Sequence, residues 1–255
     1  MKLRVLGAFG SAGIGQKPSA FLVNDRVLVD AGTVAGALTV PEQVAIQHAV
    51  ISHVHLDHIV GLAFLTDTLS MCGDDRSVTV AGIAPVVDAL RDSVFNNLVW
   101  PNFATIPSRE APVLRYRTLA EDLPQRVEDL WVTPVAVSHS VPAAGFVVHD
   151  GSRGFVYSGD TGPTDALWKA MREHGSLGAV ILECAFPNRL GDLAERSKHM
   201  TPALIQRELD KLPPDVPVWI FHIKPPFYDE TADELSRLDA HERIVILEQD
   251  KTYSI

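Results

Sequence analysis

ISHVHLDHIVGL, at residues 51–62, places three histidines and one aspartate within six positions at the end of an apolar run. A strand that runs on to His55 would point His53 and His55 to the same side, because side chains alternate along a strand. Two imidazoles in that arrangement can share one metal ion. If the chain then bends into a helix, Asp57 and His58 are aimed towards a second ion nearby. The spacing therefore favours two metal positions supplied by one loop.

The same kind of strand end recurs three times further along the chain. The apolar runs VAVSH, FVYSGD and VWIFH each finish in one metal-capable side chain: His139, Asp160 and His222. The plainer alternative treats these residues as surface polar groups, with Asp57 capping the following helix. Capping explains one aspartate, but it explains neither the neighbouring histidines nor the four strand ends together. The pattern therefore indicates a metal centre.

The ligand types point to a class of metal and of reaction. Imidazole and carboxylate ligands without cysteine are typical of Zn²⁺ and also suit Fe or Mn, so the residues select no single metal. Two such ions about 3.5–4 Å apart can clamp the attacking and leaving oxygens of an in-line displacement at phosphorus, and can generate hydroxide at neutral pH. A carboxylate is a natural bridge between two ions, and Asp160, alone in its loop, is the candidate.

Size and composition indicate an ordinary globular protein, with a single domain over residues 1–255. Of the 255 residues 46% are hydrophobic and 21% charged, which excludes disordered and fibrous classes. The net charge of −10 argues against a nucleic-acid partner, since gripping that backbone needs a basic surface. Two distant cysteines, Cys72 and Cys184, are typical of reduced thiols. With a glycine-interrupted N-terminus and no long uncharged apolar segment, we expect a cytoplasmic protein without a membrane span.

The hydrophobic pattern predicts the order of helices and strands. Strands are expected at residues 2–9, 20–24, 26–32, 49–55, 78–82, 113–119, 130–139, 144–150 and 153–160. Helices are expected from Pro41, from His58 or Ile59, and over residues 84–100. The last third alternates, with helices at 163–174, 201–211 and 229–240 and strands at 179–183, 218–223 and 244–249. Mixed strands followed by alternating helices favour two sheets between helical layers.

Taken in order along the chain, HVHLDH, SH, SGDTG and FHIKP resemble the ligand motifs of the metallo-β-lactamase superfamily. Within it, three features resemble the class II 3',5'-cyclic-nucleotide phosphodiesterases: Leu56 in HLDH, DSVFNNLVWPNF at residues 92–103, and LECAFPNRLGDLAERSKHMTP at residues 182–202. The resemblance implies an α/β (α+β) fold, the four-layer αββα metallo-β-lactamase sandwich, with a dinuclear site along the edge of the two sheets.

The resemblance also implies how two divalent metal ions are held, with Zn²⁺ as the first expectation and Fe or Mn as alternatives. One ion would be bound by His53, His55 and His139, the other by Asp57, His58 and His222, and Asp160 would bridge them. The implied substrate is a small-molecule cyclic nucleotide, cAMP or cGMP, opened to the 5'-monophosphate. A two-metal-activated hydroxide would attack phosphorus while the 3'-oxygen leaves. Superfamily phosphodiesterases often pair through their active-site helices, which leaves a homodimer open.

Three residues are the candidate catalytic side chains: Asp57, His199 and Lys224. His199, in KHMTP, resembles a superfamily position proposed to protonate a leaving oxygen or to stabilise the phosphate. The alternative for His199 is helix capping beside Thr201. Lys224 would neutralise substrate phosphate or, alternatively, pair with a neighbouring carboxylate.

Two strand-end carboxylates and one aromatic segment complete the candidates. Asp30 and Glu183 would orient a histidine ligand through its second ring nitrogen, with backbone capping as the alternative. The segment FNNLVWPNF carries aromatic faces and amides of the kind that a purine needs at a pocket rim, with core packing as the alternative for the aromatics. The residues concerned are Asn97, Trp100, Asn102 and Phe103.

Three other functions fit parts of the pattern. A tRNA 3'-processing endonuclease of the same superfamily shares the ligands, but typically grips RNA with a basic arm, and the charge here has the opposite sign. A β-lactamase or thioester hydrolase would act on acyl bonds. Asp57 and His58 with a bridging aspartate favour phosphodiesters or thioesters over the lactamases that use a cysteine there. A structural or sensory metal-binding module would hold ions without turnover.

Overall fold

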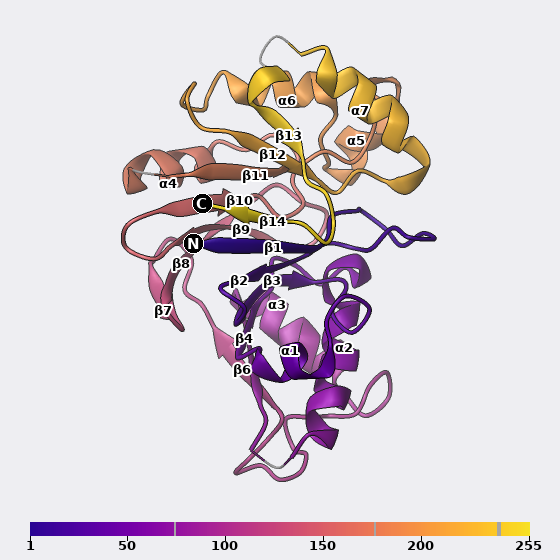
Figure 1. The fold of residues 1–255 in the computed structure, drawn as a ribbon, viewed down its shortest axis with the longest axis vertical. Coiled ribbons are helices and arrows are strands. Elements are labelled where there is room, and N and C mark those ends of the chain that lie inside the picture. The colour runs from indigo at the N-terminus through magenta and orange to yellow at the C-terminus, as the bar shows by residue number, and fades with distance from the viewer. Residues whose placement is uncertain (74, 176, 239–240) are drawn as a thin grey trace.

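The computed structural model describes residues 1–73, 75–175, 177–238 and 241–255. Within these ranges the chain forms two seven-stranded sheets, stacked as the middle layers of the molecule (Figure 1). The first sheet runs in the order β14 (Thr252–Ser254), β1 (Lys2–Gly7), β2 (Ala20–Val23), β3 (Val27–Ala31), β4 (His48–Val50), β5 (Val78–Gly82) and β6 (Leu114–Thr118). The second runs β13 (Ile244–Ile246), β12 (Val218–Phe221), β11 (Ala179–Glu183), β10 (Gly154–Tyr157), β9 (Ala144–His149), β8 (Leu130–Ala136) and β7 (Gln125–Val127).

Helices cover the outer faces of both sheets. Over the first sheet lie α1 (Val40–Ala45), α2 (Leu56–Met71) and α3 (Ala84–Ala89), which continues into a π-helical turn at Leu90–Val94. Over the second lie α4 (Ala166–His174), α5 (Gly191–Ser197), α6 (Pro202–Leu209) and α7 (Tyr228–Ser236). Short 3₁₀ turns occupy Asn188–Leu190, Pro225–Phe227 and His241–Arg243. The predicted four-layer αββα sandwich is therefore confirmed.

Buried aromatic rings join the two sheets, and two of them lie close in sequence to the candidate ligands His222 and Asp160. Phe21 on β2 meets Tyr157 on β10 and Phe221 on β12, with ring centroids 5.5 and 5.4 Å apart, both edge-to-face. All three side chains are at most 1% exposed. Edge-to-face packing of this kind adds to the area that the rings bury, so the sheets are held rigidly where the candidate ligands emerge.

The predicted strand at residues 49–55 was wrong at its end. β4 stops at Val50, and the chain then runs as irregular backbone to the first residue of α2, Leu56. Ile51 N–H still bonds to Ala81 O on β5, but Ser52 N–H donates to the carboxylate of Asp30. The pairing ends because a side chain replaces the neighbouring strand as acceptor. His53 and His55 thus lie on a loop, not on a strand.

The predicted helix at residues 84–100 was too long. Regular helix ends at Ala89 and the π-helical turn at Val94. Asn96 Oδ1 accepts hydrogen bonds from the backbone N–H groups of Leu98 and Val99, so the side chain offers the backbone an alternative to the helix.

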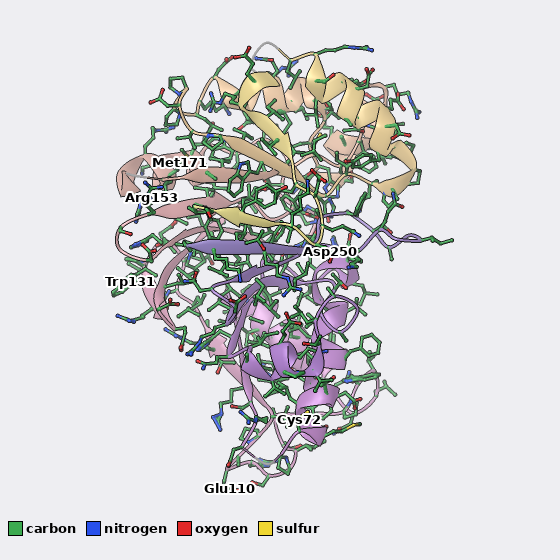
Figure 2. All side chains as sticks on the ribbon, viewed as in Figure 1. Cys72, Glu110, Trp131, Arg153, Met171 and Asp250 are labelled. Carbon is green, nitrogen blue, oxygen red and sulfur yellow. The ribbon has the colours of Figure 1, made fainter. Side chains whose placement is uncertain are left out.

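Several other helices and strands begin or end a few residues away from their predicted bounds. The predicted strand 130–139 ends at Ala136, and the predicted helix 229–240 is α7, whose expected residues 239 and 240 lie outside the described part. The two cysteines form no disulfide: Cys72 follows α2 at the lower end of the view in Figure 2, and Cys184 is buried after β11. In the described ranges no helix has both the length and the apolar character needed to cross a bilayer.

Candidate metal centre

The structure brings all seven candidate ligands together at one edge of the sandwich. The loop between β4 and α2, together with the first turn of α2, supplies four of them. The loops after β8, β10 and β12 supply one each. The candidate ligands are His53, His55, Asp57, His58, His139, Asp160 and His222. The parallel pairing of β10, β11 and β12 carries Asp160 and His222 to the same sheet edge.

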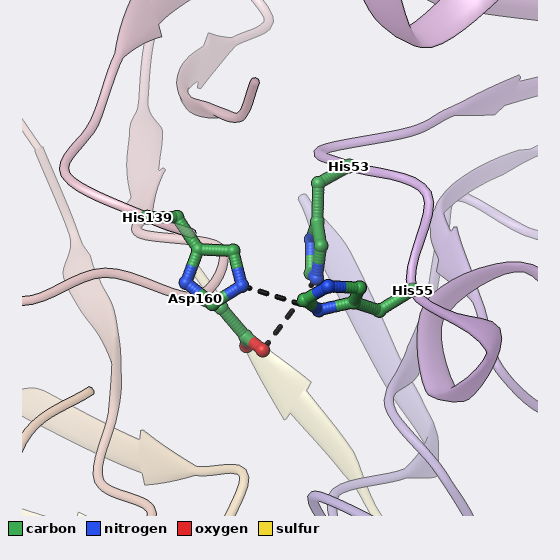
Figure 3. Close-up of side chains that lie close together, drawn as sticks. All are labelled: His53, His55, His139 and Asp160. Carbon is green, nitrogen blue, oxygen red and sulfur yellow. Dashed lines mark hydrogen bonds and ion pairs between the residues drawn. The ribbon is translucent and has the colours of Figure 1, made fainter. Parts of the chain in front are cut away.

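One group consists of His53, His55, His139 and Asp160, whose ligand atoms all lie within 4.8 Å of one another. Figure 3 shows the three imidazoles and the carboxylate facing a common centre. His139 Nε2 lies 3.2 Å from His55 Nδ1, and His53 Nε2 lies 3.6 Å from Asp160 Oδ2. Four donors at these separations can surround one ion.

A second group consists of Asp57, His58 and His222, again with ligand atoms within 4.8 Å of one another. His222 Nε2 lies 3.4 Å from Asp57 Oδ2. Asp160 reaches this group as well: its Oδ1 lies 3.2 Å from His58 Nε2, and its Oδ2 lies 3.2 Å from His222 Nε2. The carboxylate of Asp160 therefore stands between the two groups, where a bridging ligand would stand.

Unsatisfied polar atoms at this centre fit bound divalent ions. Buried polar atoms are nearly always hydrogen-bonded, because leaving one unpaired costs free energy. Five buried atoms of these side chains have no hydrogen-bond partner among the residues that the structure describes: His53 Nε2, His58 Nε2, Asp160 Oδ1 and both ring nitrogens of His222. Imidazole nitrogens and carboxylate oxygens are ligands for divalent transition metals. The residues present therefore fit the group that the sequence predicts.

Hydrogen bonds behind the imidazoles orient them. His58 Nδ1 lies 2.7 Å from Asp30 Oδ2, and His53 Nδ1 lies 3.0 Å from Ser52 Oγ. His139 Nδ1 lies 3.3 Å from the carbonyl oxygen of Lys198. When Nδ1 donates in this way, the lone pair of Nε2 is left for a metal. Asp30 thus has the geometry predicted for a carboxylate that orients a histidine.

Backbone conformation also shapes the site. Asp30 and His222 adopt φ of 54° and 71°, a left-handed region that is uncommon for residues other than glycine. Such conformations concentrate at functional sites, where surrounding contacts enforce them. A Cβ on Gly10 would lie 2.4 Å from His222 O and 2.8 Å from its Nδ1. Glycine at position 10 therefore lets the N-terminal loop pack directly on His222.

Electrostatics keeps most of the imidazoles neutral and the bridging carboxyl charged. Burial lowers the pKa of His139 and of His222 to about 4, so that both imidazoles carry free lone pairs at neutral pH. Burial also holds the pKa of His53 well below its usual range. For Asp160 burial acts in the opposite direction, but His222 and His58 hold its pKa well below the ordinary value. His58 is the exception, since Asp160 and Asp30 raise its pKa well above the ordinary value against the effect of burial. A charged carboxylate among mostly neutral imidazoles suits a cation.

The two further catalytic candidates also border the centre. His199, between α5 and α6, has a ligand-capable atom within 4.8 Å of those of Asp160 and His222. Its Nδ1 lies 2.7 Å from Glu183 Oε1, and the N-cap of α6 is Thr201, so His199 does not cap that helix. Lys224 Nζ donates to Gly10 O and lies 3.4 Å from Asp57 Oδ2.

The side chains of the segment FNNLVWPNF make contacts that stabilise the fold. Trp100 Nε1 donates to Ala63 O, Asn97 Oδ1 accepts from Asn102 N–H, and Asn102 Oδ1 accepts from Ala104 N–H. Phe103 is 3% exposed. These side chains form hydrogen bonds with backbone groups or pack in the core. Their contacts therefore give no support to the expected role of the segment at the rim of a purine pocket. Packing, the alternative reading of the aromatics, describes them better.

Sequence reasoning missed three residues that contact the centre: Ser52, Tyr157 and Gly10. Tyr157 reads as one more apolar residue of FVYSGD, and Ser52 as a spacer before the first histidine. Position next to a ligand motif could have drawn attention to Ser52 and Tyr157, whereas no local signal marks Gly10.

The chain is similar in sequence and in fold to known proteins. Residues 25–223 match the β-lactamase superfamily domain. The chain belongs to the β-lactamase superfamily. The chain is 32% identical over 202 residues to a probable 3',5'-cyclic-nucleotide phosphodiesterase of Yersinia pestis. That match covers 69% of this chain and 57% of the relative, so the chain spans little more than half the relative's length.

Two further likenesses extend over more of the chain. A 3',5'-cyclic-nucleotide phosphodiesterase of Aliivibrio fischeri is 26% identical over 277 aligned positions, covering 86% of this chain and 82% of that protein. The crystal structure of unliganded yeast PDE1 superposes with a TM-score of 0.83 at 18% identity, covering 100% of this chain and 99% of the other. The latter shows the superfamily fold. The predicted resemblance to the class II phosphodiesterases is confirmed by these relatives.

Proposed function

We propose that this chain is a metal-dependent phosphodiesterase that hydrolyses 3',5'-cyclic nucleotides such as cAMP or cGMP to 5'-monophosphates. The observation that carries the proposal is the position of Asp160, within 3.2 Å of both His58 Nε2 and His222 Nε2 and 3.6 Å from His53 Nε2. One carboxylate between two groups of ligands is the arrangement that a two-metal phosphodiesterase needs. The names of the relatives supply the substrate class.

The ligand sets are part of the proposal. His53, His55 and His139 would hold one divalent ion, Asp57, His58 and His222 the other, and Asp160 would bridge them. Once bound, the ions supply Lewis-acid chemistry, that is, polarisation of the phosphoryl oxygens and a nucleophile at neutral pH. Zn²⁺ is the first expectation, and Fe and Mn also suit these ligands.

Side chains beside the ligand groups would orient the substrate and protonate its leaving oxygen. Glu183 holds His199 through Nδ1, so the opposite edge of the imidazole remains for the leaving 3'-oxygen or the phosphate. Lys224, beside Asp57, adds a cation at the rim that attracts an anionic phosphodiester. The buried histidines exclude bulk water from the centre, which strengthens these interactions.

Turnover of a substrate panel with measured metal content tests the proposal. The panel contains cAMP, cGMP, 2',3'-cyclic nucleotides, bis-nitrophenyl phosphate, a thioester and precursor tRNA. We expect about two ions per chain and faster cleavage of a 3',5'-cyclic nucleotide than of the linear diester, with the 5'-monophosphate as product. Chelation should remove activity and Zn²⁺ or Mn²⁺ should restore it. Cleavage of the linear diester, the thioester or the tRNA alone would overturn the substrate assignment.

A further inference from the structure

The carboxylate of Asp30 collects four hydrogen bonds in a fully buried position. Its Oδ1 accepts Ser52 N–H at 2.7 Å. Its Oδ2 lies 2.7 Å from Ser52 Oγ, 2.7 Å from His58 Nδ1 and 2.6 Å from the hydroxyl of Tyr157. Asp30 is 0% exposed, so every one of these contacts is shielded from water. Buried networks in which every member is satisfied hold their side chains rigidly.

This carboxylate reaches both groups of candidate ligands. It contacts His58 of one group directly. It reaches His53 of the other through Ser52, whose Oγ lies 3.0 Å from His53 Nδ1. With the Ser52 hydroxyl donating to Asp30, its oxygen is free to accept from His53 Nδ1–H. Both imidazoles then carry their hydrogen on Nδ1 and present the Nε2 lone pair to the centre.

The fourth partner, Tyr157, comes from the opposite sheet. Asp30 lies on β3 of the first sheet, whereas Tyr157 is the last residue of β10 in the second, three positions before Asp160. The tyrosine is 0% exposed, and its ring packs against Phe21, with centroids 5.5 Å apart, and against Phe221, at 5.0 Å. The ring is therefore locked in place.

The tyrosine hydroxyl is suited to donate permanently. Burial and the neighbouring Asp30 raise the pKa of Tyr157 well above its ordinary value, so the group keeps its proton. A hydrogen bond from a buried hydroxyl to a carboxylate is among the stronger kinds in proteins. Its loss would leave Asp30 with one donor fewer and the two sheets with one polar link fewer at the site.

We propose that Tyr157 is a positioning residue that, acting through Asp30, holds one histidine of each proposed metal position in its binding orientation. The same contact ties β10, which leads to Asp160, to the segment of loop and first helical turn that carries His53 and His58. The inference rests on the proposed ligand sets and adds to them a buried relay that couples the two ions. Weakening the relay at Tyr157 should therefore weaken both ions together.

Zn²⁺ affinity, measured by competition with a chromophoric chelator, tests the relay. Loss of a residue that orients a metal ligand typically costs 10- to 100-fold in metal affinity. We expect Tyr157→Phe to weaken both stepwise Zn²⁺ affinities by about tenfold or more. Ser52→Ala removes one donor to Asp30 together with the branch to His53, so it should weaken the step that involves His53 more than the other. Tyr116→Phe is the matched control, since the Tyr116 hydroxyl on β6 is buried without a hydrogen-bond partner in the described part of the chain.

The outcomes separate this inference from the proposed function. Stepwise affinities of Tyr157→Phe within about twofold of the parent would overturn the relay. Should that variant not fold, unchanged affinity in Ser52→Ala would overturn it equally. A parent chain that binds two Zn²⁺ ions but leaves cyclic nucleotides intact overturns the proposed function. Weakened binding by Tyr157→Phe would still support the positioning role in that case.

Discussion

His199 Nδ1 lies 2.7 Å from Glu183 Oε1, a contact nearly closed to solvent because the histidine is 7% exposed and the glutamate 0%. Glu183 Oε1 also accepts the backbone N–H of Thr161 at 3.0 Å, so the carboxylate is itself held. Burial alone would lower the pKa of His199, but the charge and hydrogen bond of Glu183 raise it above the ordinary value. The imidazole is therefore oriented and keeps a proton beside the metal centre.

We expect His199→Ala to lower kcat by about 10²- to 10⁴-fold, the range that a positioned proton donor supplies. Metal content should stay near two ions per chain, because His199 is outside the proposed ligand sets. Glu183→Gln should have a smaller effect in the same direction, since it keeps the side-chain shape but removes the charge. Steady-state kinetics and metal analysis check both variants. Loss of an ion from His199→Ala would instead identify His199 as a ligand.

Asp160→Asn should remove the link between the two proposed ions. Asp160 is 1% exposed and lies among three imidazoles, so removing its charge leaves the centre without its central anion. We expect loss of at least one ion and a fall in kcat of about 10³-fold or more, as two-metal clamping is lost. Metal analysis beside kinetics measures this.

The matched control is Asp165→Asn, which alters an exposed aspartate that pairs with Lys211 and belongs to none of the candidate ligand groups. It should keep both ions and full activity. Full metal occupancy in Asp160→Asn would rule out the bridging assignment.

Lys224→Met should weaken substrate binding more than catalysis. Lys224 Nζ lies 3.4 Å from Asp57 Oδ2, at the rim of the second ligand group. A hydrogen bond to a charged group contributes about 1.5–3 kcal/mol, so we expect KM for cyclic nucleotides to rise by about tenfold or more. Kinetics at several salt concentrations check this, since screening should reduce the difference. An unchanged KM would support the alternative in which Lys224 serves Asp57 alone.

Gly61→Ala should lower the free energy of unfolding, because it disturbs the packing of α2, the helix that carries Asp57 and His58. A Cβ at Gly61 would lie 2.5 Å from Ala31 O and 2.9 Å from a methyl carbon of Val34. Overpacking of this kind costs about 1–3 kcal/mol. Urea denaturation measures the change. Gly36→Ala is the control, because its nearest neighbour would lie 3.5 Å away, and equal stabilities of the two variants would contradict the close approach.

Glu42→Gln should lower stability at neutral pH and progressively less in acid. Hydrogen bonds from Arg4 and Thr39 lower the pKa of Glu42 from 4.5 to about 2. A carboxylate with a depressed folded-state pKa stabilises the fold above its unfolded pKa, and this contribution is lost as pH falls through about 2. Since the Glu42 side chain is 39% exposed and solvent screens its charge, we expect about 1 kcal/mol at pH 7.

Urea denaturation between pH 7 and pH 3 measures the Glu42 effect. The difference between parent and variant should narrow as the pH falls below 4.5. A difference that stays constant over this range would show that the charge of Glu42 is not the cause.

The clustering of the candidate ligands could be predicted because each stands at a place that local sequence marks. His139, Asp160 and His222 follow apolar runs that form β8, β10 and β12, and strands of one sheet end at a common edge. The HVHLDH motif needed no exact secondary structure, since a loop after β4 serves as well as the expected strand. Chain order and strand ends were enough to bring these side chains together.

Element boundaries near the site depended on contacts between distant segments. β4 ends early because Asp30, more than twenty residues away in the chain, takes the N–H of Ser52. The helix after residue 84 stops early because Asn96 binds the backbone of its own loop. Hydrophobic periodicity does not record which acceptor a backbone N–H will find, so these ends were misjudged.

The amino-acid sequence by itself determined the candidate ligands, the superfamily and the four-layer architecture, because spacing and apolar periodicity are local properties of the chain. Only the tertiary structure revealed the contact between Asp30 and Tyr157, 127 positions apart and on opposite sheets. In sequence Tyr157 is one apolar residue in a buried strand. Its hydroxyl acquires a role only when the sheets pack, because burial leaves it a single charged acceptor and no water.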